Sequence, residues 1–142
     1  MIIGPRLGRF TKSGAPAPLK PFAASSIPLV TIGVFILWVG WFGFNGGSQL
    51  AMGTAVDAIA VSTIFMNTFL AGAGGVIGAA IITRLHFGKT DVVQMLNGCI
   101  GGLVAVTAEP LAPSPFAAIL IGAVGGLIAV SYTHLTLPTN LC

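Results

Sequence analysis

Residues Ala58–Ile82 read AIAVSTIFMNTFLAGAGGVIGAAII, a stretch of 25 residues without a charged side chain. The hydrocarbon core of a bilayer is about 30 Å thick, and a helix needs about 20 predominantly apolar residues to cross it. The stretch is long enough for this, so it predicts a helix that spans a membrane. The rest of the chain can be interpreted outward from this segment.

Three further apolar runs flank this one. Upstream, Phe22–Phe44 holds 23 uncharged residues and predicts a second spanning helix. Downstream, Val92–Ala108 holds 17 and lies at the lower limit for a span, while Phe116–Val130 holds 15 and is too short as it stands. The sequence therefore predicts an all-α integral membrane protein with about four transmembrane helices, near residues 22–44, 58–82, 92–108 and 115–130.

The charge content supports the membrane class. Charged residues make up 6% of the chain and the mean hydropathy is +0.99. Soluble domains contain about 25% charged residues, so this chain lacks the polar surface of a soluble domain. The net charge of +3 does not indicate nucleic-acid binding, because the basic residues flank the apolar runs and form no stripe with interleaved aromatics.

The distribution of basic residues predicts the direction of the helices. All six lysines and arginines fall in two segments, Arg6–Lys20 and Arg84–Lys89. The loops Asn45–Asp57 and Glu109–Pro115 contain none. Because Lys and Arg collect in cytoplasmic loops, the first helix should run from inside to outside, and the later helices should alternate. This places Asp57 and Glu109 on the outer face.

The chain changes character after Val130, where SYTHLTLPTN is polar, rich in threonine and interrupted by Pro138. We interpret residues 131–142 as a non-native, read-through tail that cuts the fourth helix short. A genuine juxtamembrane tail is the alternative. Residues 1–130 are then the native part of the chain and form a partial domain.

Small and polar residues inside the runs indicate helices that pack against one another. Each run contains or adjoins a Gly-xxx-Gly pair, which allows close approach of helices in lipid: Gly43/Gly47, Gly74/Gly78, Gly98/Gly102 and Gly122/Gly126. Interhelical hydrogen bonds are the expected role of the polar residues within the runs, and the lining of a polar path is the alternative; these residues are Ser62, Thr63, Asn67, Thr68 and Thr107.

The end of the first run carries the most specific motif, Gly40–Ser48, which reads GWFGFNGGS. Three more segments follow in order, FMNT at Phe65–Thr68, NGCIGGLVAVTA at Asn97–Ala108, and the glycines Gly122–Gly126. These segments, with Gly88-Lys89 between them, resemble the ammonium transporter family over about residues 3–130. This chain is similar to helices six to nine of that family.

The resemblance implies more than the residues themselves show. Family members have eleven helices and form homotrimers with one pore per subunit, and their even-numbered helices run outward. The full protein should conduct ammonium across a bacterial inner or cell membrane, with ammonia and a proton handled separately. A cytoplasmic regulatory protein is a further partner that the resemblance allows. The resemblance implies neither an enzyme nor a cofactor, and the sequence has no metal-ligand constellation or nucleophile with a base.

Three site residues follow from the resemblance. Phe44 matches one of two phenylalanines that close the outer vestibule, Ser48 matches the hydroxyl of the external ammonium site, and Thr107 aligns with a threonine near the vestibule. The family's pore histidines, its other gate phenylalanine and its vestibule tryptophan have no counterpart here. For Trp38 and Trp41 we predict interfacial or packing roles, and residues 1–142 alone should not conduct.

Two alternatives remain at this stage. A Rhesus-type gas channel shares the fold, although GWFGFNGGS favours the microbial and plant branch. The membrane domain of an ammonium sensor is the other alternative, and it would require a signalling module elsewhere in the full chain.

Overall fold

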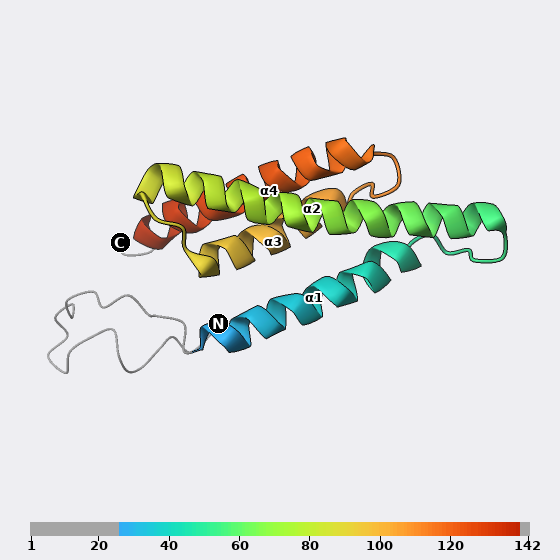
Figure 1. Ribbon diagram of the computed structural model, residues 1–142, viewed down its shortest axis with the longest axis horizontal. Coiled ribbons are helices and arrows are strands. Elements are labelled where there is room, and N and C mark those ends of the chain that lie inside the picture. The colour runs from blue at the N-terminus through green and yellow to red at the C-terminus, as the bar shows by residue number, and fades with distance from the viewer. Residues whose placement is uncertain (1–25, 140–142) are drawn as a thin grey trace, which may run out of the picture.

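The computed structural model describes residues 26–139, which form four α-helices: α1 (Ile27–Gly47), α2 (Ala55–Phe87), α3 (Val92–Val106) and α4 (Pro115–Thr139). The helices run alternately in opposite directions (Figure 1). The C-terminal ends of α1 and α3 therefore lie at the same end of the structure as the N-terminal ends of α2 and α4. The predicted all-α architecture is confirmed for these residues.

Local sequence signals explain where α2 begins and ends. The Thr54 hydroxyl accepts a hydrogen bond from the Asp57 backbone N–H at 3.2 Å, and the Asp57 carboxylate accepts one from the Thr54 backbone N–H at 3.0 Å. This reciprocal pair is a capping box, which satisfies two backbone donors at a helix start. Asp57 thus belongs to the first turn of α2, not to a loop. Gly88 ends the helix with φ of 67°, a left-handed conformation that glycine adopts without strain.

Three helices are long and apolar enough to cross a membrane, namely Ile27–Gly47, Ala55–His86 and Pro115–Thr133. The prediction that the fourth helix is too short is wrong, because the helix continues through the polar residues after Val130 as far as Thr139. By contrast, α3 has 15 residues, which at 1.5 Å per residue is only about 22 Å. The interpretation of residues 131–142 as non-native stays a prediction. Asn140–Cys142 and Arg6–Lys20 lie outside the described residues.

Glycines bring α2, α3 and α4 together. A methyl group on Gly75 of α2 would press against the carbonyl oxygen of Gly98 and lie 3.0 Å from Gly102 Cα, both in α3. On another side of α2, a methyl group on Gly78 would lie 3.0 Å from Ala123 Cα in α4. The backbones of the three helices are therefore in direct contact, as small residues allow in lipid.

The Gly-xxx-Gly prediction holds for three of the four pairs. Both members of Gly74/Gly78, Gly98/Gly102 and Gly122/Gly126 face another helix closely enough to exclude a side chain. A methyl group on Gly43 or Gly47 would meet no described atom within 4 Å. The Gly43/Gly47 pair therefore makes no close contact with the other described helices, and among the glycines of α1 it is Gly46 that approaches α2, at Phe65.

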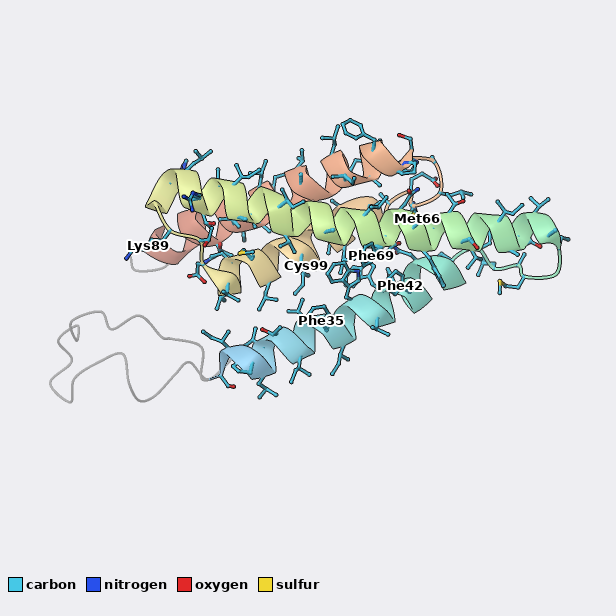
Figure 2. All side chains as sticks on the ribbon, viewed as in Figure 1. Phe35, Phe42, Met66, Phe69, Lys89 and Cys99 are labelled. Carbon is cyan, nitrogen blue, oxygen red and sulfur yellow. The ribbon has the colours of Figure 1, made fainter. Side chains whose placement is uncertain are left out.

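Helix α1 is held more loosely than the rest. Its buried residues are Val34, Asn45 and Gly46, and most of its apolar side chains are exposed. Phe42 of α1 and Phe69 of α2 lie between the two helices (Figure 2). Nearer its N-terminus, α1 borders a groove of about 450 Å³ whose walls include Phe35, Trp38 and Cys99. Besides Val34, which packs against Cys99 and Leu103 of α3, the buried residues of α1 lie at its C-terminal end.

Candidate functional site

Phe44 and Ser48 lie in the last turn and at the C-cap of α1, on one exposed face. Residues four apart on a helix are neighbours on its surface, and the Ser48 hydroxyl donates a hydrogen bond to the Phe44 carbonyl oxygen at 2.9 Å. The Phe44 side chain is 62% exposed. The structure thus places an aromatic ring and a hydroxyl oxygen side by side at this end of the bundle.

Trp41 connects this face to α3. Its indole ring lies 5.8 Å from the Phe44 ring, measured between centroids, with the planes inclined at 59°. Its Nε1–H donates a hydrogen bond to the Thr107 hydroxyl oxygen at 2.8 Å, and the Thr107 hydroxyl donates to the Leu103 carbonyl oxygen at 2.8 Å. Trp41 therefore links Phe44 to Thr107, and Ser48 joins this group through the Phe44 carbonyl oxygen.

The two hydroxyl groups differ in what they can still bind. A hydroxyl has one hydrogen to donate and two lone pairs to accept hydrogen bonds. Ser48 has used its hydrogen, so its oxygen is available as an acceptor for an N–H or O–H donor. Thr107 has used its hydrogen and accepts from Trp41, which leaves it one lone pair. Ser48 is therefore the better acceptor of the two, and Thr107 mainly holds Trp41.

Three polar residues predicted to make interhelical hydrogen bonds connect separate segments. The side-chain amide of Asn45 in α1 donates to the Thr68 hydroxyl oxygen in α2 at 3.0 Å. The amide of Asn67 donates to the carbonyl oxygens of Pro110 and Pro113, at 2.9 and 2.8 Å, and so ties α2 to the loop after α3. Thr68 and Thr107, which bond to residues of α1, confirm the prediction, whereas the described hydrogen bonds of the Asn67 side chain reach a loop and not another helix.

The same prediction is wrong for Ser62 and Thr63. Their hydroxyls donate to carbonyl oxygens of their own helix, Ala58 at 2.8 Å and Ile59 at 3.0 Å. Serine and threonine in helices often satisfy their hydroxyl in this way, so residue type alone does not indicate an interhelical partner. Both residues line a separate cavity of about 420 Å³ beside Met66 and Pro115, where α2 meets the start of α4.

The two tryptophans of α1 also differ in the contacts that they make. Trp38 packs as predicted, with its ring stacked on Phe35 at 6.2 Å and tilted against Phe69 at 5.5 Å. Trp41 does more than pack, because its hydrogen bond joins α1 to α3 beside the candidate residues. The sequence carried one signal for this role, since Trp41 lies three residues before Phe44 and such residues meet on a helix.

Comparison with known proteins gives a consistent result. The sequence model of the Ammonium Transporter Family matches residues 1–139. "Ammonium transporter Amt2" of Archaeoglobus fulgidus is 42% identical over 120 residues, which are 84% of this chain and 24% of that protein. "Ammonium transporter 1 member 2" of Arabidopsis thaliana is 35% identical over 128 residues, again 84% of this chain and 24% of that protein.

A solved structure is similar along most of the chain. It is described as "Sensor Amt Protein", and the match has a TM-score of 0.75 and 30% sequence identity. The match covers 92% of this chain and 30% of the solved chain. This chain thus spans about a quarter of the length of the curated relatives that it matches.

Proposed function

Because this chain belongs to the ammonium transporter family, whose model matches residues 1–139, we propose that it forms part of a channel or transporter that conducts ammonium or ammonia across a membrane. The family is non-enzymatic and multi-pass. The end of the bundle that carries Phe44 and Ser48 is the outer mouth of the conducting path. The observation that carries this proposal is the grouping of the three residues, in which Trp41 joins Phe44 to Thr107 and Ser48 bonds to the Phe44 carbonyl oxygen.

The chemistry of the two exposed groups suits ammonium. An aromatic ring attracts a cation by about 0.5–2 kcal/mol, with the larger value where water is excluded. Potassium is attracted as well, so the ring of Phe44 alone does not select ammonium. The Ser48 oxygen adds selectivity, because it accepts an N–H hydrogen bond and potassium has no hydrogen to donate.

The proposal gives Ser48 and Phe44 separable effects in the full-length transporter. Ser48→Ala removes one hydrogen bond to a charged group, which is worth about 1.5–3 kcal/mol at most. This corresponds to a loss of apparent ammonium affinity of about ten- to hundredfold, and the loss is smaller where water replaces the oxygen. Phe44→Ala should change the maximal rate or the leak more than the affinity, because the ring forms the barrier next to the acceptor.

Uptake of labelled methylammonium over a range of concentrations tests both substitutions. Ser62→Ala is a matched control, because Ser62 is also an exposed serine that donates to the carbonyl oxygen four residues earlier but lies away from Phe44. If Ser48→Ala and Phe44→Ala both leave the concentration dependence and maximal rate unchanged in well-folded transporter, the Gly40–Ser48 segment serves helix packing only and the proposal fails.

The likeness to the solved "Sensor Amt Protein" favours a second candidate, the membrane domain of an ammonium sensor. A sensor would bind ammonium at the same face while a signalling domain elsewhere in the full chain reports it. The coding sequence that adjoins residues 1–142 distinguishes the two, because a sensor requires a kinase, cyclase or comparable domain. A Rhesus-type gas channel is the remaining alternative within transport.

Family membership also supports a proposal about assembly. The full-length protein forms a homotrimer with a pore in each subunit, and a cytoplasmic regulatory protein binds its inner face. In this proposal the 1–142 segment supplies four of eleven helices in each subunit, as part of a bacterial inner or cell membrane. The segment therefore does not conduct when it is expressed alone.

A further inference from the structure

Asn45 lies between Phe44 and Ser48 in the sequence but points away from the exposed face. It is 1% exposed, whereas Phe44 is 62% exposed. Its side-chain nitrogen donates to the Thr68 hydroxyl oxygen at 3.0 Å, and Thr68 itself is 0% exposed. The Thr68 hydroxyl donates in turn to the Ile64 carbonyl oxygen at 2.7 Å, which fixes the direction in which its oxygen accepts.

The surroundings of this pair make it the directional contact between α1 and α2. The other contacts of this end of α1 with α2 are apolar: Gly46 lies directly against the Phe65 ring, and the rings of Phe42 and Phe65 lie 5.4 Å apart. Apolar contacts of this kind tolerate sliding and rotation better than a hydrogen bond does, because a hydrogen bond weakens steeply when its angle departs from linear. Toward the N-terminus of α1, the groove beside Trp38 leaves the helix with fewer contacts to α2 and α3.

We propose that Asn45 and Thr68 are positioning residues, whose hydrogen bond sets the rotation of α1 and so holds Phe44 and Ser48 toward the substrate. The inference rests on the proposed function. Neighbouring residues on an α-helix are separated by about 100° of rotation. Fixing Asn45 against α2 therefore fixes the directions of Phe44 and Ser48 as well. Neither Asn45 nor Thr68 needs to contact ammonium for this.

The effect on binding follows from the fraction of molecules in the competent arrangement. The apparent dissociation constant of a ligand equals its intrinsic value divided by the fraction of protein that is competent to bind. Without the Asn45–Thr68 bond, the Trp41–Thr107 bond to α3 is the interhelical hydrogen bond of α1 that remains among the described residues. One such bond restrains the rotation of α1 less than two do, so this fraction falls. The apparent affinity for ammonium should then fall too, although every group of the binding face is still present.

Thr68→Val in the full-length transporter removes the hydroxyl and keeps the shape of the side chain. We expect the concentration for half-maximal methylammonium uptake to rise by about three- to tenfold, the size that interhelical hydrogen bonds in membranes support. Thr68→Ser keeps the hydroxyl and should restore the original value. Asn45→Leu removes the amide that donates the same hydrogen bond, and it should raise the half-maximal concentration as much as Thr68→Val does. The two variants serve as alternatives if one of them folds poorly.

Thr83→Val is the matched control. Thr83 lies in the same helix, is 1% exposed and donates to the Ala79 carbonyl oxygen at 2.7 Å, as Thr68 does to Ile64. No described hydrogen bond joins it to α1. Thr83→Val should leave the half-maximal concentration unchanged, so that a difference between the two valine variants isolates the bond to Asn45.

A double-mutant cycle with Ser48→Ala distinguishes positioning from a general loss of stability. If Thr68 acts through Ser48, Thr68→Val should have little further effect on the half-maximal concentration once Ser48 is alanine. The inference is overturned if Ser48→Ala raises the half-maximal concentration but Thr68→Val does not. It is also overturned if Thr83→Val raises this concentration as much as Thr68→Val does, or if Thr68→Val has its full effect in the Ser48→Ala background. If Ser48→Ala leaves uptake unchanged, the proposed function and this inference both fail.

Discussion

Ser48 and Thr107 each donate a hydroxyl hydrogen to a carbonyl oxygen one turn earlier, but only Thr107 also accepts a hydrogen bond, from Trp41. Residue type and local position are nearly the same for the two, so the sequence alone does not separate their roles. The difference comes from a partner that is 66 residues away in the chain. For Trp41 the sequence predicted only packing or an interfacial role, because its hydrogen-bond partner depends on how α1 and α3 meet.

The role of Trp41 leads to a prediction at the same scale. Trp41→Phe keeps an aromatic ring beside Phe44 but leaves Thr107 without its donor. We expect the purified full-length protein to lose about 0.6 kcal/mol of stability, the average for such bonds in membranes. The loss is measured by heating the protein and determining the folded fraction by size-exclusion chromatography, a readout that does not use tryptophan fluorescence.

Trp38→Phe provides the comparison for that measurement. The Trp38 indole nitrogen is buried without a hydrogen-bond partner among the described residues. Its replacement should therefore cost less than the replacement of Trp41, or should stabilise the protein by removing an unsatisfied polar group. Equal losses in the two variants would show that the Trp41–Thr107 bond contributes nothing beyond packing.

At the scale of the helices, apolar run length predicted the existence and order of all four elements. It predicted their ends less well: α2 extends from Ala55 to Phe87, beyond the predicted 58–82, because the Thr54–Asp57 capping box and Gly88 determine its limits. Run length also failed for α4, which continues into polar residues. Apolar composition indicates which residues can lie in the hydrocarbon core, whereas hydrogen bonds at the caps determine where the helix begins and ends.

The glycine contacts give a prediction about these elements. Gly75→Ala would place a methyl group against the backbone of Gly98 and Gly102, which cannot move aside as a side chain can. Overpacking costs about 1–3 kcal/mol in well-packed cores, and we expect a loss at the upper end of that range. The yield and thermal stability of the full-length protein in detergent measure it.

Gly33→Ala tests whether the effect is specific to the contact. Gly33 also lies within a transmembrane helix, but a methyl group there would meet no described atom within 4 Å. Alanine also has the higher helix propensity, so this substitution should be neutral or slightly stabilising. A Gly75→Ala variant as stable as Gly33→Ala would contradict the close packing of α2 against α3.

For the whole molecule, the direction of the chain is a prediction from the positive-inside rule. Lys89 lies at the end of the bundle opposite the start of α2 (Figure 2), on the predicted cytoplasmic side. Lys89→Cys is a better probe than a cysteine at Gly88, because Gly88 has a φ of 67° that a side chain would strain. An impermeant thiol reagent should label this cysteine only after the cells are permeabilised. Labelling of intact cells would reverse the assigned direction.

The candidate site is the part of the molecule that the sequence alone defined least directly. Phe44, Ser48 and Thr107 came from the resemblance of GWFGFNGGS and NGCIGGLVAVTA to the family, and no periodicity or spacing would have joined α1 to α3. The buried Asn45–Thr68 pair could be anticipated only as far as polar residues within apolar runs tend to find partners. Which polar residue meets which depends on the packing of whole helices.

The central claim is that the end of α1 binds ammonium at the outer mouth of a conducting path. Gly47→Cys in the full-length protein tests it directly, because Gly47 adjoins Ser48 and a Cβ added there meets no atom of the described residues within 4 Å. The native Cys99 is buried and should react little. An impermeant thiol reagent should label Gly47→Cys in intact cells, and ammonium should slow the labelling while potassium at the same concentration does not. Labelling only after permeabilisation, or equal rates in ammonium and potassium, would contradict the account.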